Sequence, residues 1–240
     1  MLLLEQQKND KKWLTRKTKP DLVVNPDRII RSVELFAGAG GLSLGLSEYC
    51  RRVGFRHKIE FAAEWNEDIM DVFLTNNSPT TYSTSSVDQM FDGKLKLGRR
   101  LTKIEKSFVK EHPHAMNPDV LMGGPPCQGH SNHNNYTRRT DDRNKLYLRM
   151  VRAAQVLKPS TVIIENVRDV EKSEGDEVNI ATKHLEKMGY HVDHKVLCAA
   201  HYGVAQMRYR HFLIASNKAN PEFHQLLDLK VNKNRSVLWA

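Results

Sequence analysis

The segment Ile29–Phe36 (IIRSVELF) and the five residues after it, Ala37-Gly38-Ala39-Gly40-Gly41, decide which fold we expect. The first is a short run rich in apolar and β-branched residues, which is typical of a buried strand. Leu42–Leu46 can then begin a helix. Glycines between a strand and a helix let a ligand approach the backbone closely, and the helix start offers free N–H groups. Because Gly45 stands one place late for the G-x-G-x-x-G pattern, a tight turn without a ligand explains this motif equally well.

Further strands and helices alternate along the chain. Apolar runs predict strands at Ile59–Ala63, Asp119–Met122, Thr161–Ile164, His191–Leu197 and Phe212–Ala215. Helical patterns predict helices at Asn66–Leu74, Leu146–Leu157 and Val178–Met188, and a basic, partly helical stretch over 92–118. This alternation favours a doubly wound α/β sheet, in which ligands bind beyond the carboxyl ends of the strands.

Composition narrows the class of protein. The chain has 240 residues, of which 40% are hydrophobic and 27% charged, as in a globular protein. We expect a basic extension over 1–28, a main domain over 29–216 and a remainder over 217–240.

No apolar run approaches the roughly 20 residues of a membrane span, and Met1–Leu4 is too short for a signal peptide, so we expect a cytoplasmic protein. A net charge of +9 and a pI of about 9.4 fit either a nucleic-acid partner or a merely basic surface.

Cys127 is the cysteine whose surroundings suggest chemistry. With Cys50 and Cys198 it forms no C-x-x-C pair and no metal-ligand spacing, so we expect neither a disulfide framework nor a metal site. Pro125 and Pro126 stiffen the chain just before it, at the end of a predicted strand. A thiol becomes nucleophilic where cations or a helix start stabilise its thiolate. Cations follow in the chain at Arg138, Arg139, Arg143 and Lys145. A lone cysteine is more often an inert buried residue, but the two prolines favour the reactive interpretation.

Two carboxylates also follow predicted strands. Glu64 stands where a carboxylate can accept hydrogen bonds from ribose hydroxyls, and Trp65 beside it could pack on an adenine ring. The alternatives are a surface glutamate and a core tryptophan. Glu165 follows Thr161–Ile164, and partial burial there would raise its pKa and suit it to general acid catalysis. The alternative is an acid that only caps a helix.

An arginine-rich segment precedes the last predicted strand. Gln206, Arg208 and Arg210 occupy alternate positions, and alternate residues of a strand share one face. These three side chains could therefore hold a base or a phosphate together. A salt-bridged surface strand is the other interpretation of the same pattern.

In order and spacing, these segments resemble the cytosine-C5 DNA methyltransferase family of bacterial type. The resemblance covers residues 30–216 and combines a Pro-Pro-Cys, a Glu-Asn-Val and a Gln-x-Arg-x-Arg motif. The blocks that carry it are Glu34–Leu42, Glu64-Trp65, Asp119–Gln128, Ile163–Val167, Gln206–Arg210 and Phe212–Ala215. It implies a class I S-adenosylmethionine-dependent methyltransferase fold, a Rossmann-like sheet that is mostly parallel with one antiparallel strand.

The resemblance also implies roles for individual residues. The residues expected to hold S-adenosylmethionine are Phe36, Ala37, Gly38, Gly40, Gly41, Leu42, Glu64, Trp65, Ser86, Val87, Asp88 and Pro125. Which of the three residues at 86–88 meets adenine stays open. The residues expected to contact DNA are Gln128, Ser131, Arg138, Arg139 and Gln206.

In the implied mechanism, the target cytosine is flipped out of double-stranded DNA and attacked at C6 by the Cys127 thiolate. Glu165 supplies or shares a proton at N3, and Arg210 contacts O2 with support from Arg208. The acid prevents anionic charge from building on the ring, so that C5 can take the methyl group.

Family members continue after the last matched block with a variable target-recognition region and two more blocks. Here only residues 217–240 remain, so we expect either a truncated chain or a split enzyme. In the second case another polypeptide carries target recognition, and a restriction–modification role fits.

Three alternatives stay open. An RNA-directed (tRNA) cytosine-C5 methyltransferase shares the chemistry, but Gly129-His130-Ser131 after Cys127-Gln128 is closer to the bacterial DNA enzymes. A catalytically inactive S-adenosylmethionine-binding regulator would not need the intact catalytic residues. A Rossmann-type dehydrogenase is suggested only by the glycines after the first strand.

Overall fold

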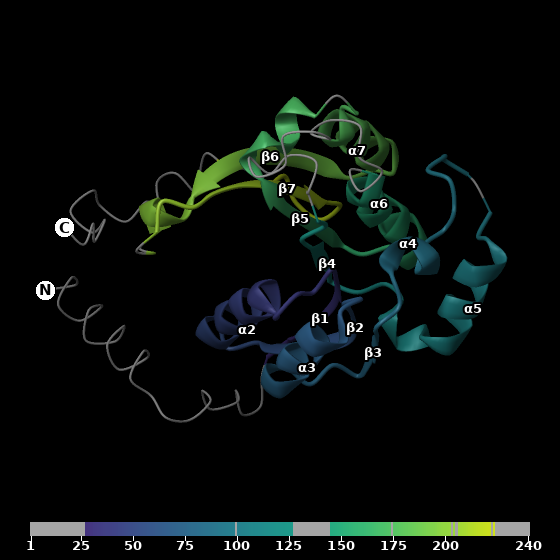
Figure 1. The fold of residues 1–240 in the computed structure, drawn as a ribbon, viewed down its shortest axis with the longest axis horizontal. Coiled ribbons are helices and arrows are strands. Elements are labelled where there is room, and N and C mark those ends of the chain that lie inside the picture. The colour runs from purple at the N-terminus through teal and green to yellow at the C-terminus, as the bar shows by residue number, and fades with distance from the viewer. Residues whose placement is uncertain are drawn as a thin grey trace, which may run out of the picture.

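The computed structural model describes residues 27–98, 100–126, 145–173, 175–202, 204, 206–221 and 223. Seven strands of this part form one sheet, in the order β3-β2-β1-β4-β5-β7-β6 (Figure 1). The strands are β1 (Ile29–Leu35), β2 (Arg56–Ala63), β3 (Thr81–Ser83), β4 (Val120–Gly123), β5 (Thr161–Val167), β6 (His191–Cys198) and β7 (Tyr209–Ser216). The helices are α2 (Gly41–Arg52), α3 (Glu67–Asn76), α4 (Val87–Met90), α5 (Lys103–Glu111), α6 (Lys145–Leu157) and α7 (Glu177–Lys187), with 3₁₀ turns η1 (Pro113–Ala115), η4 (Arg168–Lys172) and η5 (Ala199–Tyr202).

Only β7 runs against its neighbours. It pairs antiparallel with both β5 and β6, whereas β3, β2, β1, β4 and β5 pair in parallel. Parallel neighbours need crossover connections, and helices supply most of them here. The expected fold, a mostly parallel doubly wound sheet with one antiparallel strand, is therefore confirmed.

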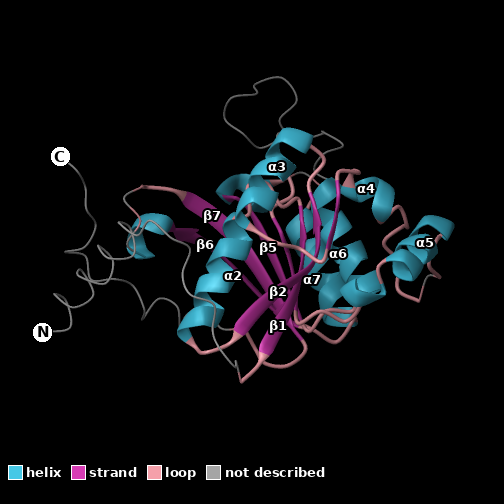
Figure 2. Cartoon of the chain, turned by 90° about the horizontal axis from the view of Figure 1, so that it is seen from below, coloured by secondary structure: helices cyan, strands magenta, loops and turns pink. Residues whose placement is uncertain are grey.

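Helices cover both faces of the sheet. In Figures 1 and 2, α2 and α3 lie on one face, and α6 and α7 lie on the other. The smaller core cluster joins Met70 and Phe73 of α3 to strand residues such as Ala62. The larger cluster joins apolar residues of α4, α5, α6 and α7 to the other face of the same strands. Strand residues alternate between the two clusters, as Phe61 and Ala62 do, because successive side chains of a strand point to opposite faces.

Several element boundaries differ from expectation. β1 ends at Leu35, because Phe36 adopts a φ of 54°, which no strand accommodates. β5 runs on to Val167, so Glu165 and Asn166 lie within the strand rather than after it. The short edge strand β3 was not predicted. In the basic stretch over 92–118, the helix is α5, whose capping box joins Thr102 and Glu105.

The ends of the chain lie mostly outside the described residues. Of the predicted extension over 1–28, only Asp27 and Arg28 are described. Beyond β7, Phe223 is buried and its N–H donates to Asp193 of β6 at 2.8 Å. In the described part of the chain, no helix is long and apolar enough to cross a membrane.

A buried ion pair joins α5 to α6. The Arg152 guanidinium donates from Nε and Nη2 to the two carboxylate oxygens of Glu105, at 2.7 and 2.5 Å, and both side chains are almost fully buried. Burial raises the pKa of Glu105, but hydrogen bonds from Arg152 and from the N–H groups of Thr102 and Gly93 outweigh it and hold the pKa below its ordinary value. A Cβ at Gly93 would lie 2.4 Å from Arg152 Nε, so a side chain there would displace the guanidinium from its pair with Glu105.

We predict that Arg152→Ala lowers the free energy of unfolding by about 3–5 kcal/mol, because it leaves the Glu105 charge buried without its partner. Urea unfolding followed by circular dichroism measures the loss. Arg51→Ala is the matched control, since Arg51 forms an exposed pair with Glu48 and its loss costs about 0–1 kcal/mol. Equal losses in the two variants would contradict the importance of the buried pair.

Candidate active site

The candidate site lies where the sheet order reverses. From β1 the chain crosses to β2 on one side, whereas β4 is followed by β5 on the other side, and β1 and β4 are neighbours. The loops after β1 and β4 therefore leave the sheet in opposite directions, which is where doubly wound sheets bind ligands. Figure 2 shows β1, β2 and β5 running between α2 on one face and α6 on the other.

The loop after β1 has an unusual backbone. Phe36, Gly38 and Gly40 all have positive φ values, of 54°, 52° and 88°. A Cβ at Gly40 would lie 2.5 Å from the Asn77 side-chain nitrogen, so glycine is required there by conformation and by space. The loop is tied to the sheet by the Ala37 N–H, which donates to the Ala63 carbonyl at 2.9 Å. α2 then begins, and its first residues include the predicted Gly41 and Leu42.

Glu64, the residue after β2, holds the loop after β1 through a hydrogen bond. Its side chain is buried, and its two carboxylate oxygens accept the Gly38 N–H at 3.0 Å and the Asn66 N–H at 3.1 Å. The interpretation of Glu64 as a surface glutamate is therefore wrong. A carboxylate has about four acceptor positions, so Glu64 keeps capacity for a ligand after fixing the loop. Trp65 is 68% exposed, which rules out its alternative as a core residue.

The predicted residues at 86–88 surround the start of α4. The Ser86 hydroxyl donates to the Asp88 carboxylate, and the Val87 side chain is buried in the larger core cluster. β3 links this segment to β2, since its last residue, Ser83, accepts the Glu64 N–H at 3.2 Å. Ser86 and Asp88 thus offer polar groups after β3, as Glu64 does after β2.

Glu34, which the sequence analysis gave no role, is a buried carboxyl group just below the loop. It stands on β1 at 1% exposure and accepts a hydrogen bond from the Ser43 hydroxyl of α2. Burial raises its pKa from 4.5 to about 7, against the lowering effect of the Ser43 hydrogen bonds. No polarity pattern distinguishes Glu34 from a surface residue, because only the packing of α2 on β1 buries it.

The segment after β4 is held against β5. The Asn166 amide donates to the Pro125 carbonyl at 3.3 Å, and Asn166 is buried. Sequence reasoning gave no role to Asn166, although it stands in the Glu-Asn-Val motif. The next residue after Pro126 is Cys127, and the described part of the chain resumes at Lys145. Five predicted site residues therefore lie outside the described residues: Cys127, Gln128, Ser131, Arg138 and Arg139.

Glu165 and Arg210 form an ion pair between β5 and β7. Arg210 Nε lies 3.0 Å from Glu165 Oε1, and each side chain is about one quarter exposed. Burial raises the pKa of Glu165, while the Arg210 and Arg208 charges and the Arg210 hydrogen bond lower it by a smaller amount. The carboxyl group also lies against the loop after β4, since a Cβ at Gly124 would be 3.1 Å from Glu165 Oε2. A partly buried acid thus meets a fixed guanidinium beside the residues that precede Cys127.

The prediction that Gln206, Arg208 and Arg210 share one strand face is wrong. β7 begins at Tyr209, and only Arg210 of the three belongs to it. Gln206 and Arg208 lie in the turn before it, where the Arg208 N–H donates to the Gln206 carbonyl at 2.8 Å. Both side chains are exposed, and the positive charge of Arg208 lowers the pKa of Glu165 without a hydrogen bond between them.

Comparisons with known proteins agree with this arrangement. Residues 30–238 match the family described as C-5 cytosine-specific DNA methylase. The Type II methyltransferase M1.BsuMI of Bacillus subtilis is 35% identical over 231 residues, covering 96% of this chain and 53% of the relative. M1.HphI of Haemophilus parahaemolyticus is 32% identical over 181 residues, covering 74% of this chain and 43% of the relative.

A solved structure is also similar. It is a putative DNA modification methyltransferase encoded within a prophage of E. coli, with a TM-score of 0.59 and 29% identity over 81% of this chain and 49% of that one. The chain spans about half the length of the first relative, M1.BsuMI. Because the family match extends over most of the chain, including the loops after β1 and β4 and the Glu165–Arg210 pair, the chain belongs to the C-5 cytosine-specific DNA methylase family.

Proposed function

We propose that this chain is the catalytic part of a DNA (cytosine-5-)-methyltransferase that transfers a methyl group from S-adenosylmethionine to C5 of cytosine. The observation that carries the proposal is the ion pair of Glu165 and Arg210, whose Oε1 and Nε atoms are 3.0 Å apart. This pair lies beside Gly124, three residues before Cys127. An acid and a guanidinium at this separation match the N3 and O2 edge of cytosine, where one proton and one hydrogen bond are needed.

The loop after β1 fits S-adenosylmethionine. Gly38 and Gly40 have no side chains, so a ligand can approach the backbone of the loop closely. Glu64 has acceptor positions left for ribose hydroxyls, and the exposed Trp65 ring can stack on adenine. Ser86 and Asp88 after β3 and Pro125 after β4 are the further candidates for contacts. When bound, the cofactor would supply an electrophilic methyl group.

The chain's own residues would prepare the cytosine. The Cys127 thiolate forms a bond to C6, and the electron pair displaced from the C5–C6 double bond moves toward N3, which takes a proton from Glu165. Arg210 holds O2, and Arg208 adds positive charge nearby. C5 is then part of an enamine and nucleophilic enough to accept the methyl group. Loss of the C5 proton to a base restores the C5–C6 double bond while the C6–S bond breaks and its electron pair returns to Cys127. N3 gives its proton back to Glu165, and the methylated base is released.

Double-stranded DNA is the proposed substrate, with the target base flipped out of the helix. The support is the family, the net charge of +9 and the exposed Gln206 and Arg208 near the Glu165–Arg210 pair. Gln128, Ser131, Arg138 and Arg139 are proposed to contact DNA as well.

We propose, further, that the chain acts in a restriction–modification system with a second polypeptide that carries target recognition. The support is its similarity to Type II methyltransferases, of which it spans about half.

We predict that Cys127→Ala abolishes transfer of labelled methyl groups from S-adenosylmethionine to duplex DNA, because no other group then adds to C6. The assay uses the chain alone and the chain with the product of the adjacent gene, and RNA as a second substrate. Cys198→Ala is the matched control, since Cys198 is buried. Normal turnover by Cys127→Ala would contradict the covalent mechanism, and transfer only to RNA would favour the RNA-directed alternative.

We predict that Glu64→Ala weakens S-adenosylmethionine binding by roughly 10- to 100-fold, because it removes charge-assisted hydrogen bonds from both the loop and the ribose. Isothermal titration calorimetry measures the dissociation constant. Glu67→Ala is the control, since Glu67 is an exposed acid three residues later, at the start of α3. An unchanged constant for Glu64→Ala would remove Glu64 from the cofactor site.

The pH dependence of transfer tests the role of Glu165. A general acid works only while protonated, so the rate of a single turnover falls as the pH rises through the raised pKa of Glu165. Arg210→Met removes a charge that lowers this pKa, so we predict that the falling limb moves to higher pH while the maximal rate drops. The exposed Arg51→Met is the control. If the falling part of the pH–rate profile stays at the same pH in Arg210→Met, Glu165 is not the general acid.

A further inference from the structure

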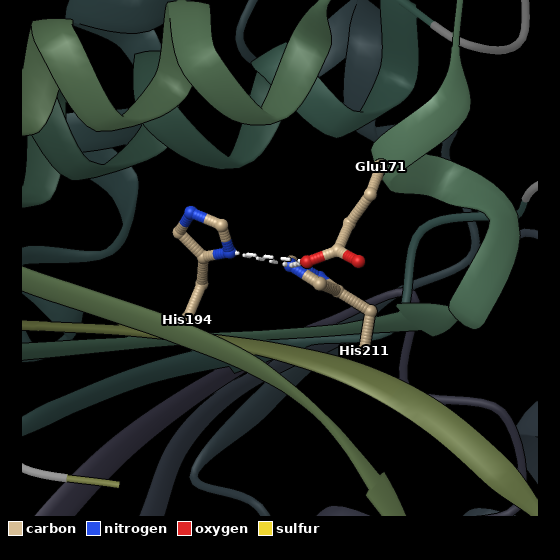
Figure 3. Close-up of side chains that lie close together, drawn as sticks. All are labelled: Glu171, His194 and His211. Atoms are coloured by element: carbon tan, nitrogen blue, oxygen red, sulfur yellow. Dashed lines mark hydrogen bonds and ion pairs between the residues drawn. The ribbon is translucent and has the colours of Figure 1, made fainter.

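Three side chains that the proposed function does not use converge on one point near the Glu165–Arg210 pair. Glu171 comes from η4, His194 from β6 and His211 from β7, and Figure 3 shows the three pointing toward one another. His211 follows Arg210 in the chain, and successive residues of a strand face opposite sides of the sheet. The cluster therefore lies on the face of the sheet opposite the Glu165–Arg210 pair.

The distances within this cluster are longer than those of good hydrogen bonds. His211 Nε2 and His194 Nδ1 are 3.3 Å apart, and Glu171 Oε1 lies 3.3 Å from His194 Nδ1 and 3.6 Å from His211 Nε2. Hydrogen bonds between nitrogen and oxygen are usually about 2.7–3.2 Å long. At Nε2, the ring nitrogen that faces the cluster, the fully buried His211 has these long contacts in place of a short hydrogen bond.

The same distances fit a shared cation. A point equidistant from the three donor atoms lies about 2.0 Å from each, and bonds from zinc to histidine nitrogen and carboxylate oxygen are about 2.0–2.2 Å long. Neighbouring ligands of a tetrahedral ion with such bonds are about 3.4 Å apart, close to the observed separations. Three donor atoms at these separations leave a fourth position for water.

The chemistry of the donors selects the class of cation. Two imidazoles and one carboxylate suit Zn²⁺ and similar transition metals, whereas Mg²⁺ and Ca²⁺ prefer sites made of oxygen alone. An imidazole must be neutral to bind a metal.

We propose that Glu171, His194 and His211 bind a divalent transition metal of the Zn²⁺ class, in a site separate from the Glu165–Arg210 pair. The site departs from our expectation of no metal, which rested on the spacing of the cysteines. The ion joins η4, which follows β5 directly, to the β6–β7 pair, and so fixes the strand that carries Arg210. The exposed sides of Glu171 and His194, at 39% and 34%, give the ion access from solvent.

Metal titration tests the proposal without any assay of methyl transfer, so its outcome is independent of the proposed function. The untagged 240-residue chain is treated with a chelator, dialysed and titrated with Co²⁺, whose absorption reports tetrahedral coordination. Zn²⁺ affinity is then measured by competition with a chromophoric chelator. The variants are His194→Gln and Glu171→Gln, which alter partly exposed side chains and spare the buried His211. His191→Gln is the matched control, an exposed histidine on the same strand.

We expect the unaltered chain and His191→Gln to bind one equivalent with tetrahedral absorption bands. We expect His194→Gln and Glu171→Gln to bind at least roughly tenfold more weakly, because each lacks one ligand. Zn²⁺ should also raise the midpoint of thermal unfolding in the first two proteins by more than in the ligand variants, since the site exists only in the folded chain. Absence of binding, or equal affinity in all four proteins, would overturn the proposal.

Discussion

At Gly123 the strands β1 and β4 approach so closely that no side chain fits between them. A Cβ at this position would lie 2.3 Å from the Leu35 carbonyl oxygen and 2.9 Å from the Met150 sulfur, so β1, β4 and α6 can meet only at a glycine. Both candidate loops start from this contact, one after Leu35 and the other after Gly123. A single close contact in the middle of the sheet therefore sets the distance between the loop after β1 and the segment that leads to Cys127.

Two buried polar side chains hold the loops in place by hydrogen bonds to their backbone. Glu64 accepts the Gly38 N–H, and Asn166 donates to the Pro125 carbonyl. Glu64 directly follows β2 and Asn166 lies within β5. Each holds the backbone of the loop at the end of the adjacent strand, where a tight turn would otherwise have unpaired polar groups. Sites supported in this way keep their geometry before a ligand arrives, which lowers the entropic cost of binding.

The sequence predicted the central strands and most of the flanking helices, because their apolar periodicity is local. It missed β3, which has only three residues, none of them buried, at the edge of the sheet. It also missed the Glu105–Arg152 pair, since a contact between residues 47 positions apart leaves no local pattern. For the site, motif order identified Glu165 and Arg210, but their pairing depends on the register of β5 against β7. The Glu171, His194 and His211 cluster stayed hidden for the same reason, because three separate elements contribute to it.

The burial of Glu34 couples the folding of this chain to the proton concentration of its surroundings. The pKa is about 7 in the folded chain and near 4.5 once the carboxyl group is exposed to water, so folding between these pH values is accompanied by proton uptake. A raised folded-state pKa contributes stability that is fully present below pH 4.5 and is lost as the pH rises through about 7. Near pH 7 the proton is close to its point of release, and the packing of α2 on β1 therefore responds to small changes in pH.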